Sequence, residues 1–177
     1  MKFIVLDRDG VINKDSDQFI KSPDEWEAIP GSLEAIAKLN QAGWRVVVAS
    51  NQSGVGRGLF GMDMLNAING RMNEALAQSG GRLDAIFFCP HAADSTCDCR
   101  KPKPGLLAQI QERFSVDLTG APIVGDSLRD LQAGIAVGCK PFLVLTGKGE
   151  KTRDDPDLPP DTQIFPDLAA VVDSLLD

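Results

Sequence analysis

The stretch KFIVLDRDG, residues 2–10, places two aspartates directly after a short apolar run. A bounded run of about four to eight apolar residues is typical of a buried strand. Asp7 and Asp9 would then stand at the carboxyl end of that strand, with one residue between them. Two ionised carboxylates so close together repel each other unless a cation lies between them, so a strand end that binds a divalent metal ion is one interpretation; a turn with a helix-capping acid is the alternative.

The same strand-like signal returns along the chain, and each time an amphipathic, helix-like segment follows. Strands are predicted over 2–6, 44–50, 84–89, 121–126 and 141–146. Helices are predicted over 32–43, 62–79, the segment after Pro104, the segment from Leu128 to Gly138, and 168–176, and the polar segment 148–162 is expected to be a loop. Strands that alternate with helices predict a parallel sheet covered on both faces. We expect a three-layer, Rossmann-like α/β fold that forms one domain, residues 1–177.

The composition and the net charge of the chain argue against nucleic acid and membranes as binding partners. The chain carries 18 lysines and arginines against 25 acidic residues, a formal net charge of −7. Binding to nucleic acid or to an anionic membrane needs a basic face, so neither partner is expected. The N-terminus lacks the long apolar stretch of a signal peptide, and nothing approaches the roughly 20 apolar residues of a membrane span. We expect a cytoplasmic protein and a monomer.

Polar side chains with useful chemistry follow four of the five predicted strands. They are Asp7 and Asp9, the run from Ser50 to Ser53, Arg100 with Lys101, and Asp126. Ligands of parallel sheets bind beyond the carboxyl ends of the strands, so we expect these side chains to meet. Asp130 follows as well, but it is expected on the face of the next helix rather than among metal ligands. Aspartate can attack phosphorus, a second acid can move the proton, and carboxylates can hold Mg²⁺.

Residues 89–99 contain three of the four cysteines and the single histidine of the chain. They form two pairs with one residue between the members, Cys89 with His91 and Cys97 with Cys99. Structural Zn²⁺ takes such a Cys₃His set tetrahedrally, which leaves no open position for catalysis. We therefore expect a structural zinc ion that stiffens this loop and directs the basic residues after it; unligated thiols and a disulfide are the alternatives.

The segments DRDGVIN, SNQSG, RKPKPG and VGDS occur in this order, each after a predicted strand. Their order and spacing, over about residues 3–147, resemble those of the haloacid dehalogenase (HAD) phosphatases. The resemblance implies the HAD fold, a catalytic Mg²⁺ and an aspartyl-phosphate intermediate. The metal loop is similar to that of the branch that acts on heptose bisphosphate and histidinol phosphate.

The resemblance assigns roles to the acids at the strand ends. Asp7 is expected to be the nucleophile and a Mg²⁺ ligand. Asp9 is expected to be the general acid and base and, through its backbone carbonyl, a second Mg²⁺ ligand. Asp126 is expected to anchor the metal from the fourth strand.

The resemblance also names the groups that stabilise the phosphate. Ser50 is expected to hold phosphate oxygens with its hydroxyl group. A lysine is expected to balance the charge, and Lys101 and Lys103 both follow the third strand. We prefer Lys101 because it directly follows the predicted zinc loop, as in related phosphatases.

No segment is long enough for the cap domain that covers the site in many HAD phosphatases. The loops 13–22, 53–61 and 89–100 are therefore expected to shape an open pocket. Such a pocket suits a small phosphorylated sugar with one phosphate transferred and one held, and Arg100 is the expected holder because guanidinium grips phosphate with two hydrogen bonds. Further substrate-binding candidates are Asp15, Asn51, Gln52, Ser53 and Arg57. The branch implies removal of the 7-phosphate of a heptose 1,7-bisphosphate during lipopolysaccharide precursor synthesis; histidinol phosphate or a nucleic-acid 3′ phosphate are the alternatives.

Overall fold

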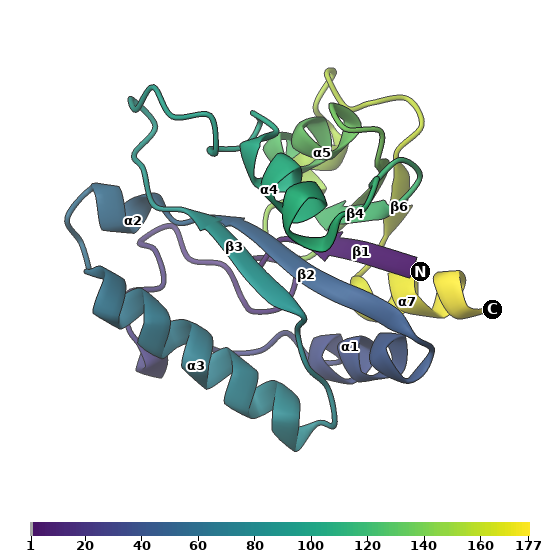
Figure 1. Cartoon of the computed structure of the whole chain (residues 1–177), viewed down its shortest axis with the longest axis horizontal. Coiled ribbons are helices and arrows are strands. Elements are labelled where there is room, and N and C mark those ends of the chain that lie inside the picture. The colour runs from purple at the N-terminus through teal and green to yellow at the C-terminus, as the bar shows by residue number, and fades with distance from the viewer. Residues whose placement is uncertain (1) are drawn as a thin grey trace.

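The structure, a computed structural model, describes residues 2–177 and contains a six-stranded sheet whose neighbouring strands are all parallel (Figure 1). The strand order is β3-β2-β1-β4-β5-β6. The strands are β1 (Lys2–Leu6), β2 (Trp44–Asn51), β3 (Ala85–Cys89), β4 (Pro122–Gly125), β5 (Lys140–Val144) and β6 (Gln163–Phe165). The α-helices are α1 (Ser32–Gln41), α2 (Ser53–Gly56), α3 (Met62–Gln78), α4 (Gly105–Phe114), α5 (Leu128–Ile135), α6 (Gly149–Arg153) and α7 (Leu168–Leu176), and Pro23–Glu25 form a short 3₁₀ helix.

The first strand lies at the centre of the sheet and is buried on both faces. Its side chains alternate between two hydrophobic clusters, because successive residues of a strand point to opposite faces. Ile4 and Leu6 join one cluster, and Phe3 and Val5 join the other. This double burial explains why the strand reads as an unbroken apolar run rather than as an alternating pattern.

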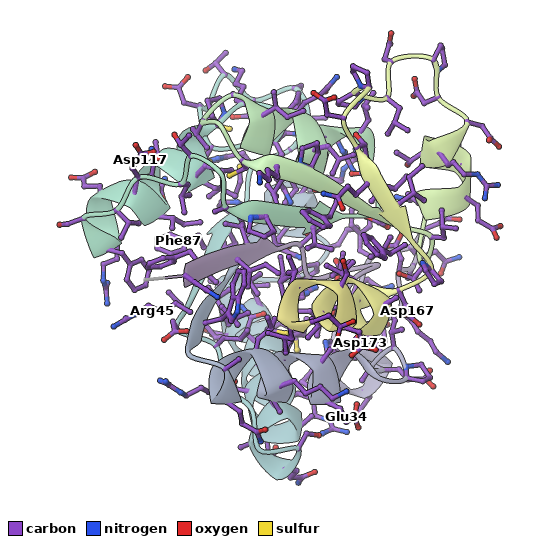
Figure 2. All side chains as sticks on the ribbon, turned by 90° about the vertical axis from the view of Figure 1, so that its right-hand side faces the viewer. Glu34, Arg45, Phe87, Asp117, Asp167 and Asp173 are labelled. Atoms are coloured by element: carbon purple, nitrogen blue, oxygen red, sulfur yellow. The ribbon has the colours of Figure 1, made fainter. Side chains whose placement is uncertain are left out.

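Helices cover both faces of the sheet, which gives the predicted three layers (Figure 1). Buried side chains of α1, α3 and α7 belong to the cluster around Ile4, whereas those of α4 and α5 belong to the cluster around Val5. Figure 2 shows the same layering from the side, with Asp167 at the start of α7. The Asp167 carboxylate accepts a hydrogen bond of 2.9 Å from the backbone N–H of Ala170 and so caps this helix.

Up to the end of β5 the predicted strands and helices are present, but the prediction lacked the 3₁₀ helix Pro23–Glu25 and the short helix α2, which lies in the segment 53–61 that was expected to be a loop. The segment after β5 also departs from the prediction. We expected residues 148–162 to be a loop, but they begin with the short helix α6, and a sixth strand follows at Gln163–Phe165. The strand is only three residues long and lies at the sheet edge with two exposed side chains, so it carries no apolar run. Among the described residues, no helix is both long and apolar enough to cross a membrane.

Candidate active site

The carboxyl ends of β1, β2 and β4 and the loop after β3 surround a cavity of about 230 Å³. The segment after β1 contributes Asp7, Asp9, Asp15, Ser16, Asp17 and Phe19. The end of β2 and the segments after β2 and β3 contribute Asn51, Ser53, Arg57, Arg100 and Lys101. The segments after β4 and β5 contribute Asp126, Ser127, Arg129, Asp130 and Lys148. The expected meeting of the strand ends is therefore present. Of the residues predicted here outside the zinc loop, Ser50 and Gln52 do not line the cavity.

Three carboxylates crowd together at the floor of the cavity. One oxygen from each of Asp7, Asp126 and Asp130 lies within 4.8 Å of the others. Burial and the charge of Asp130 raise the pKa of Asp126 to about 7. Burial and the same neighbour also raise the pKa of Asp7 well above its usual range. Both shifts are expected where like charges are buried together, and a bound cation would reverse them.

The hydrogen bonds show which of these carboxylates remain available to a metal. Both oxygens of Asp130 are engaged, one by Lys101 at 2.7 Å and the other by the Ser127 hydroxyl at 3.0 Å. Asp7 and Asp126 each keep one oxygen that accepts no hydrogen bond from residues 2–177. Hard oxygen donors with spare lone pairs fit Mg²⁺, which binds few carboxylates and keeps places for water and phosphate. The donor set therefore fits the predicted ion with Asp130 outside its ligands.

The Lys101 ammonium group is buried in the centre of this cluster. It donates to the backbone oxygen of Ala49 at 2.6 Å and lies 2.7 Å from Asp130 and 3.2 Å from Asp7. Burial alone would lower the pKa of Lys101, but the two carboxylates outweigh burial and raise it. Lys103 is instead exposed and donates to the Cys97 carbonyl oxygen at 2.9 Å. Of the two candidate lysines, the structure brings only Lys101 to the acids.

Asp9 has a different environment from Asp7, although one residue separates them. Its carboxylate accepts from Arg8 Nε at 2.8 Å, from Asn13 Nδ2 at 2.9 Å and from Gln52 Nε2 at 3.3 Å. Burial would raise the pKa of Asp9, but the charge and hydrogen bonds of the buried Arg8 lower it. The two acids predicted for nucleophile and acid–base roles thus have pKa values shifted in opposite directions.

The end of β2 connects the first loop with the loop after β3. Asn51 donates to the Lys101 carbonyl oxygen at 3.1 Å and accepts from the Lys101 backbone N–H at 3.0 Å. Gln52 donates to the Ser50 hydroxyl at 2.7 Å and accepts from Arg8 at 3.2 Å. Ser50, Gln52 and Ser53 are all buried, but only Ser53 lines the cavity. The predicted phosphate-binding hydroxyl therefore lies behind the wall and is held by its neighbour.

Two glycines leave space for the Asp126 carboxylate. Gly10 has a φ of 87° and Gly147 a φ of 57°, a region that other residues rarely adopt. A Cβ added at either position would collide with Oδ2 of Asp126. The same oxygen accepts from the Lys148 backbone N–H at 3.0 Å. Glycines are needed here because the backbone closes around the carboxylate from two sides.

Three arginines stand at the cavity wall: Arg57, Arg100 and Arg129. No carboxylate of residues 2–177 lies within 4.0 Å of their guanidinium nitrogens. Burial and the charges of Arg129 and Arg57 lower the pKa of Arg100. Nη1 of Arg100 is buried and has no hydrogen-bond partner among the described residues. Grouped guanidinium groups without acidic partners favour an anionic ligand.

Asp15, a predicted substrate residue, faces the loop after β5. Its carboxylate lies 3.5 Å from Nζ of Lys148, and both residues line the cavity. The side chain of Lys148 is about half exposed. This ion pair therefore connects the first loop to the last loop at the mouth of the site.

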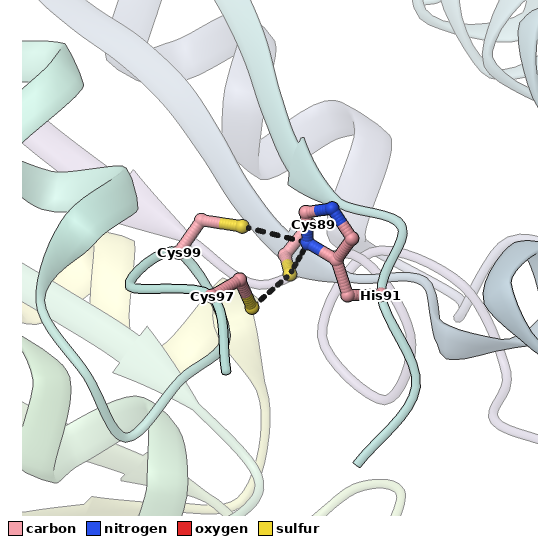
Figure 3. Close-up of side chains that lie close together, drawn as sticks. All are labelled: Cys89, His91, Cys97 and Cys99. Atoms are coloured by element: carbon pink, nitrogen blue, oxygen red, sulfur yellow. Dashed lines mark hydrogen bonds between the residues drawn. The ribbon is translucent and has the colours of Figure 1, made fainter. Parts of the chain in front are cut away.

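The four predicted zinc ligands converge beside the active site (Figure 3). Nδ1 of His91 lies 3.3 Å from the sulfur atoms of Cys89 and Cys99, and the sulfurs of Cys89 and Cys97 are 3.6 Å apart. Tetrahedral zinc with Zn–S bonds of about 2.3 Å places its ligand atoms about 3.8 Å apart. All three cysteines are free thiols. Burial and hydrogen bonding with Cys89 and Cys97 raise the pKa of Cys99 to about 12. Desolvation would raise the pKa of Cys97 as well, but hydrogen bonds, that of Ser95 first, outweigh desolvation and lower this pKa to about 6. The cluster can hold a zinc ion.

Seven residues that line the cavity were not among the predicted site residues: Ser16, Asp17, Phe19, Ser127, Arg129, Asp130 and Lys148. Asp130 lies on a helix as expected, as the third residue of α5, but its burial and its capping box with Ser127 were not predicted. The Ser-x-x-Asp spacing was a usable signal for that position. Arg129 and Lys148 were not predicted, because a basic residue after a strand carries no motif of its own.

Comparisons with known proteins agree with this geometry. Residues 2–132 match the profile of the family "Polynucleotide kinase 3 phosphatase", and residues 98–171 match the family described as "HAD-hyrolase-like". A D-glycero-beta-D-manno-heptose-1,7-bisphosphate 7-phosphatase of Bordetella bronchiseptica is 60% identical over 176 residues, which cover 99% of this chain and 98% of the relative. The Pseudomonas aeruginosa protein with the same description is 56% identical over 173 residues, 98% of this chain and 97% of the relative.

A solved structure gives the same result for the fold. The crystal structure of the D,D-heptose 1,7-bisphosphate phosphatase from B. bronchiseptica, complexed with magnesium and phosphate, superimposes with a TM-score of 0.97 at 60% identity. The match covers 99% of this chain and 98% of that one. The predicted HAD-type α/β fold is confirmed.

We predict that Lys101→Met destabilises the protein strongly, whereas Lys103→Met does not. Removing one partner of a buried ion pair leaves uncompensated charge and costs roughly 3–5 kcal/mol. An exposed lysine away from such features contributes about 0.5 kcal/mol or less. Urea unfolding in the presence of a chelator measures both variants. Equal losses for the two would contradict the central position given to Lys101.

We also predict that Cys97→Ala lowers the zinc content and loosens the loop, because three ligands hold the ion less well than four. Cys139→Ala is the matched control, since Cys139 is a buried cysteine outside the ligand group, with its thiol against the Leu118 carbonyl oxygen. Elemental analysis measures zinc, and hydrogen exchange measures protection of residues 89–100. A Cys97→Ala variant with the zinc stoichiometry of the unmodified chain would refute the ligand assignment.

Proposed function

The chain belongs to the D-glycero-beta-D-manno-heptose-1,7-bisphosphate 7-phosphatase family of HAD-like phosphoric monoester hydrolases, and we propose that it removes the 7-phosphate of that sugar through an aspartyl-phosphate intermediate. One observation carries this proposal. Asp7, a carboxylate with one oxygen that accepts no hydrogen bond from residues 2–177, stands beside the buried Lys101 in a cavity whose wall holds three arginines without a carboxylate partner in that range. A nucleophile, a charge-balancing cation and a second anion site are the parts that this reaction needs.

We assign Mg²⁺ to the free oxygens of Asp7 and Asp126, with the backbone carbonyl of Asp9 as a further ligand. When bound, the ion neutralises the crowded carboxylates and offsets the charge of the transferred phosphoryl group. The magnesium and phosphate in the B. bronchiseptica structure support this assignment. We assign Zn²⁺ to the four ligands of residues 89–99, where it stiffens the loop that carries Arg100 and Lys101.

In the first step, an oxygen of Asp7 attacks the phosphorus of the 7-phosphate. The new Asp7–phosphorus bond forms as the bond between phosphorus and the sugar oxygen breaks. The sugar oxygen takes its proton from the carboxyl group of Asp9. Arg8 lowers the pKa of Asp9, whereas the charge of an incoming phosphate opposes its ionisation and raises the pKa.

In the second step, Asp9 acts as the base and takes a proton from water. The water oxygen attacks phosphorus, the bond to Asp7 breaks, and inorganic phosphate leaves. Lys101 stabilises the negative charge on Asp7 when the carboxylate is released. We propose that the Ser50 side chain, which accepts a hydrogen bond from Gln52 behind the cavity wall, turns toward the cavity when the substrate binds and then donates to a phosphoryl oxygen.

The second phosphate of the substrate fits the three arginines. Arg100 is the best placed because its buried Nη1 lacks a partner among the described residues, and a phosphate oxygen would supply one. Arg57 and Arg129 add positive charge around it. We assign the contacts with the sugar to the polar residues that line the same cavity, Asn51, Ser53 and Asp15.

The charge of the site argues against the other substrates of this branch. Histidinol phosphate carries an ammonium group, which unpaired arginines would repel. A nucleic-acid 3′ phosphate would bring a polyanion to a chain with a net charge of −7. We further propose that the chain acts as a cytoplasmic monomer in heptose synthesis for lipopolysaccharide, without nucleic-acid or membrane partners.

The function is tested first with Asp7→Asn. This variant is expected to lose phosphate release from the heptose bisphosphate by at least about a thousandfold, because the nucleophile is gone. Its circular dichroism and thermal transition should match those of the unmodified chain. Asp117→Asn, an exposed aspartate remote from the site and labelled in Figure 2, is the control. Normal phosphate release by Asp7→Asn with Mg²⁺ would refute the mechanism.

Arg100→Ala tests the second phosphate site. Its kcat/KM for heptose 1,7-bisphosphate is expected to fall about tenfold to a hundredfold, the worth of charge-assisted hydrogen bonds. The value for heptose 7-phosphate should fall much less, because that compound lacks the held phosphate. Arg113→Ala, an exposed arginine on α4, provides the control. Equal losses for both compounds would remove this role from Arg100.

A further inference from the structure

Phe19 has a backbone conformation that side-chain-bearing residues rarely adopt. Its φ is 66°, in the left-handed region, and it lies in the loop between β1 and the 3₁₀ helix. Such strain is kept only where the surroundings enforce it, and it is found most often at functional sites. Phe19 lines the active-site cavity, so the strained residue belongs to the wall of the site.

The neighbours of Phe19 explain how the strain is maintained. Ile20 is buried in the first core cluster and fixes the chain directly after Phe19. The backbone N–H of Phe19 donates to the Ser16 carbonyl oxygen at 3.2 Å, and Lys21 Nζ donates to the Gln18 carbonyl oxygen at 2.8 Å. The turn and the core anchor together leave the Phe19 ring outside the core, at the cavity wall.

The ring contacts Arg57, one of the three arginines at the cavity wall. The guanidinium carbon of Arg57 lies 5.7 Å from the centre of the Phe19 ring, within the range of a cation–π interaction. Arg57 is exposed and ends the short helix α2, with its backbone N–H bonded to the Ser53 carbonyl oxygen at 2.9 Å. Its backbone is therefore fixed, but no acidic partner among residues 2–177 restrains its side chain.

The backbone before Arg57 is also locked against the zinc loop. The N–H of Gly56 donates to the Pro90 carbonyl oxygen at 2.7 Å, and a Cβ at Gly56 would collide with that segment. Phe19, Arg57 and Ala92 also line a second, shallower hollow outside the site. Loops 13–22, 53–61 and 89–100 thus meet at this point, and the Phe19 ring is the contribution of the first loop.

We propose that Phe19 is a positioning residue for substrate recognition, and that its ring holds the Arg57 guanidinium group toward the second phosphate of the substrate. The proposal rests on the proposed function, because it assumes a bisphosphate whose second phosphate lies among the arginines. It assigns to Phe19 no contact with the transferred phosphate. An arginine held in place before binding loses less side-chain freedom when the anion arrives, so the ring raises affinity for the bisphosphate.

The test is a double-mutant cycle in the Asp7→Asn background, which allows binding to be measured by calorimetry without turnover. The variants are Phe19→Leu, Phe19→Tyr, Arg57→Ala and the combination of Phe19→Leu with Arg57→Ala. Phe19→Leu is expected to weaken binding of heptose 1,7-bisphosphate about threefold, as an exposed cation–π contact suggests. Phe19→Tyr keeps the ring and should retain the affinity. Phe19→Leu should cause no further loss once Arg57 is alanine.

Two controls separate this role from general loosening of the loop. Heptose 7-phosphate, which lacks the second phosphate, should show no coupling between positions 19 and 57. Arg45→Ala removes a similar contact far from the site, where Arg45 lies 5.9 Å from the Phe114 ring, and should leave the affinity unchanged. An additive threefold loss in the double variant, or the same loss for heptose 7-phosphate, would overturn the proposal.

The failure of the proposed function gives a different result. In that case the unmodified chain would release no phosphate from heptose 1,7-bisphosphate, whatever the residue at position 19. The double-mutant cycle measures binding and not hydrolysis, so its result on Phe19 does not depend on whether the chain hydrolyses the bisphosphate. If the bisphosphate binds and is hydrolysed but positions 19 and 57 are not coupled, only the inference about Phe19 is wrong.

Discussion

The buried ammonium group of Lys101 is the contact on which the rest of the site depends. It joins the ends of β1 and β2 and the start of α5, because its partners are Asp7, the Ala49 carbonyl oxygen and Asp130. All three of its protons have acceptors, so the cation tolerates burial and in turn keeps the acids together. The zinc loop supplies this lysine, and the double hydrogen bond from Asn51 fixes its backbone.

Around that cation, one strand end produces two chemically different acids. Asp7 lies among other carboxylates and has a raised pKa, whereas Asp9 lies against Arg8 and has a lowered one. Environments that move two carboxyl groups in opposite directions allow them to take different parts in one reaction. The intervening residue makes this difference, since the buried Arg8 side chain binds only the second acid.

The residues that follow strands could be predicted from the sequence, because a parallel sheet brings its carboxyl ends together whatever the loops do. The ligand pairs of residues 89–99 were equally clear from spacing alone. The sequence did not decide whether Lys101 or Lys103 is the lysine beside the acids. The structure decides it, because the Lys101 side chain faces Asp7 whereas that of Lys103 contacts a backbone oxygen of the zinc loop. Asp130 lies on the helix where it was expected, but its burial and its ion pair with Lys101 could not be predicted, because a helix pattern does not show which neighbours cover a polar position. The edge strand β6 was not predicted, because a three-residue strand with exposed side chains has no apolar run in the sequence.

The enclosure of Asp126 by two glycines has a consequence for how the protein is made. Gly10 and Thr146, which stand 136 residues apart, are joined by a hydrogen bond of 2.7 Å at the same place. The aspartate is therefore held from both sides only after the segment that follows β5 has been synthesised and has folded back against the first loop. A nascent chain that stops after α5 has all of the acids of the site but lacks Gly147 and Thr146, so the site is completed late in translation.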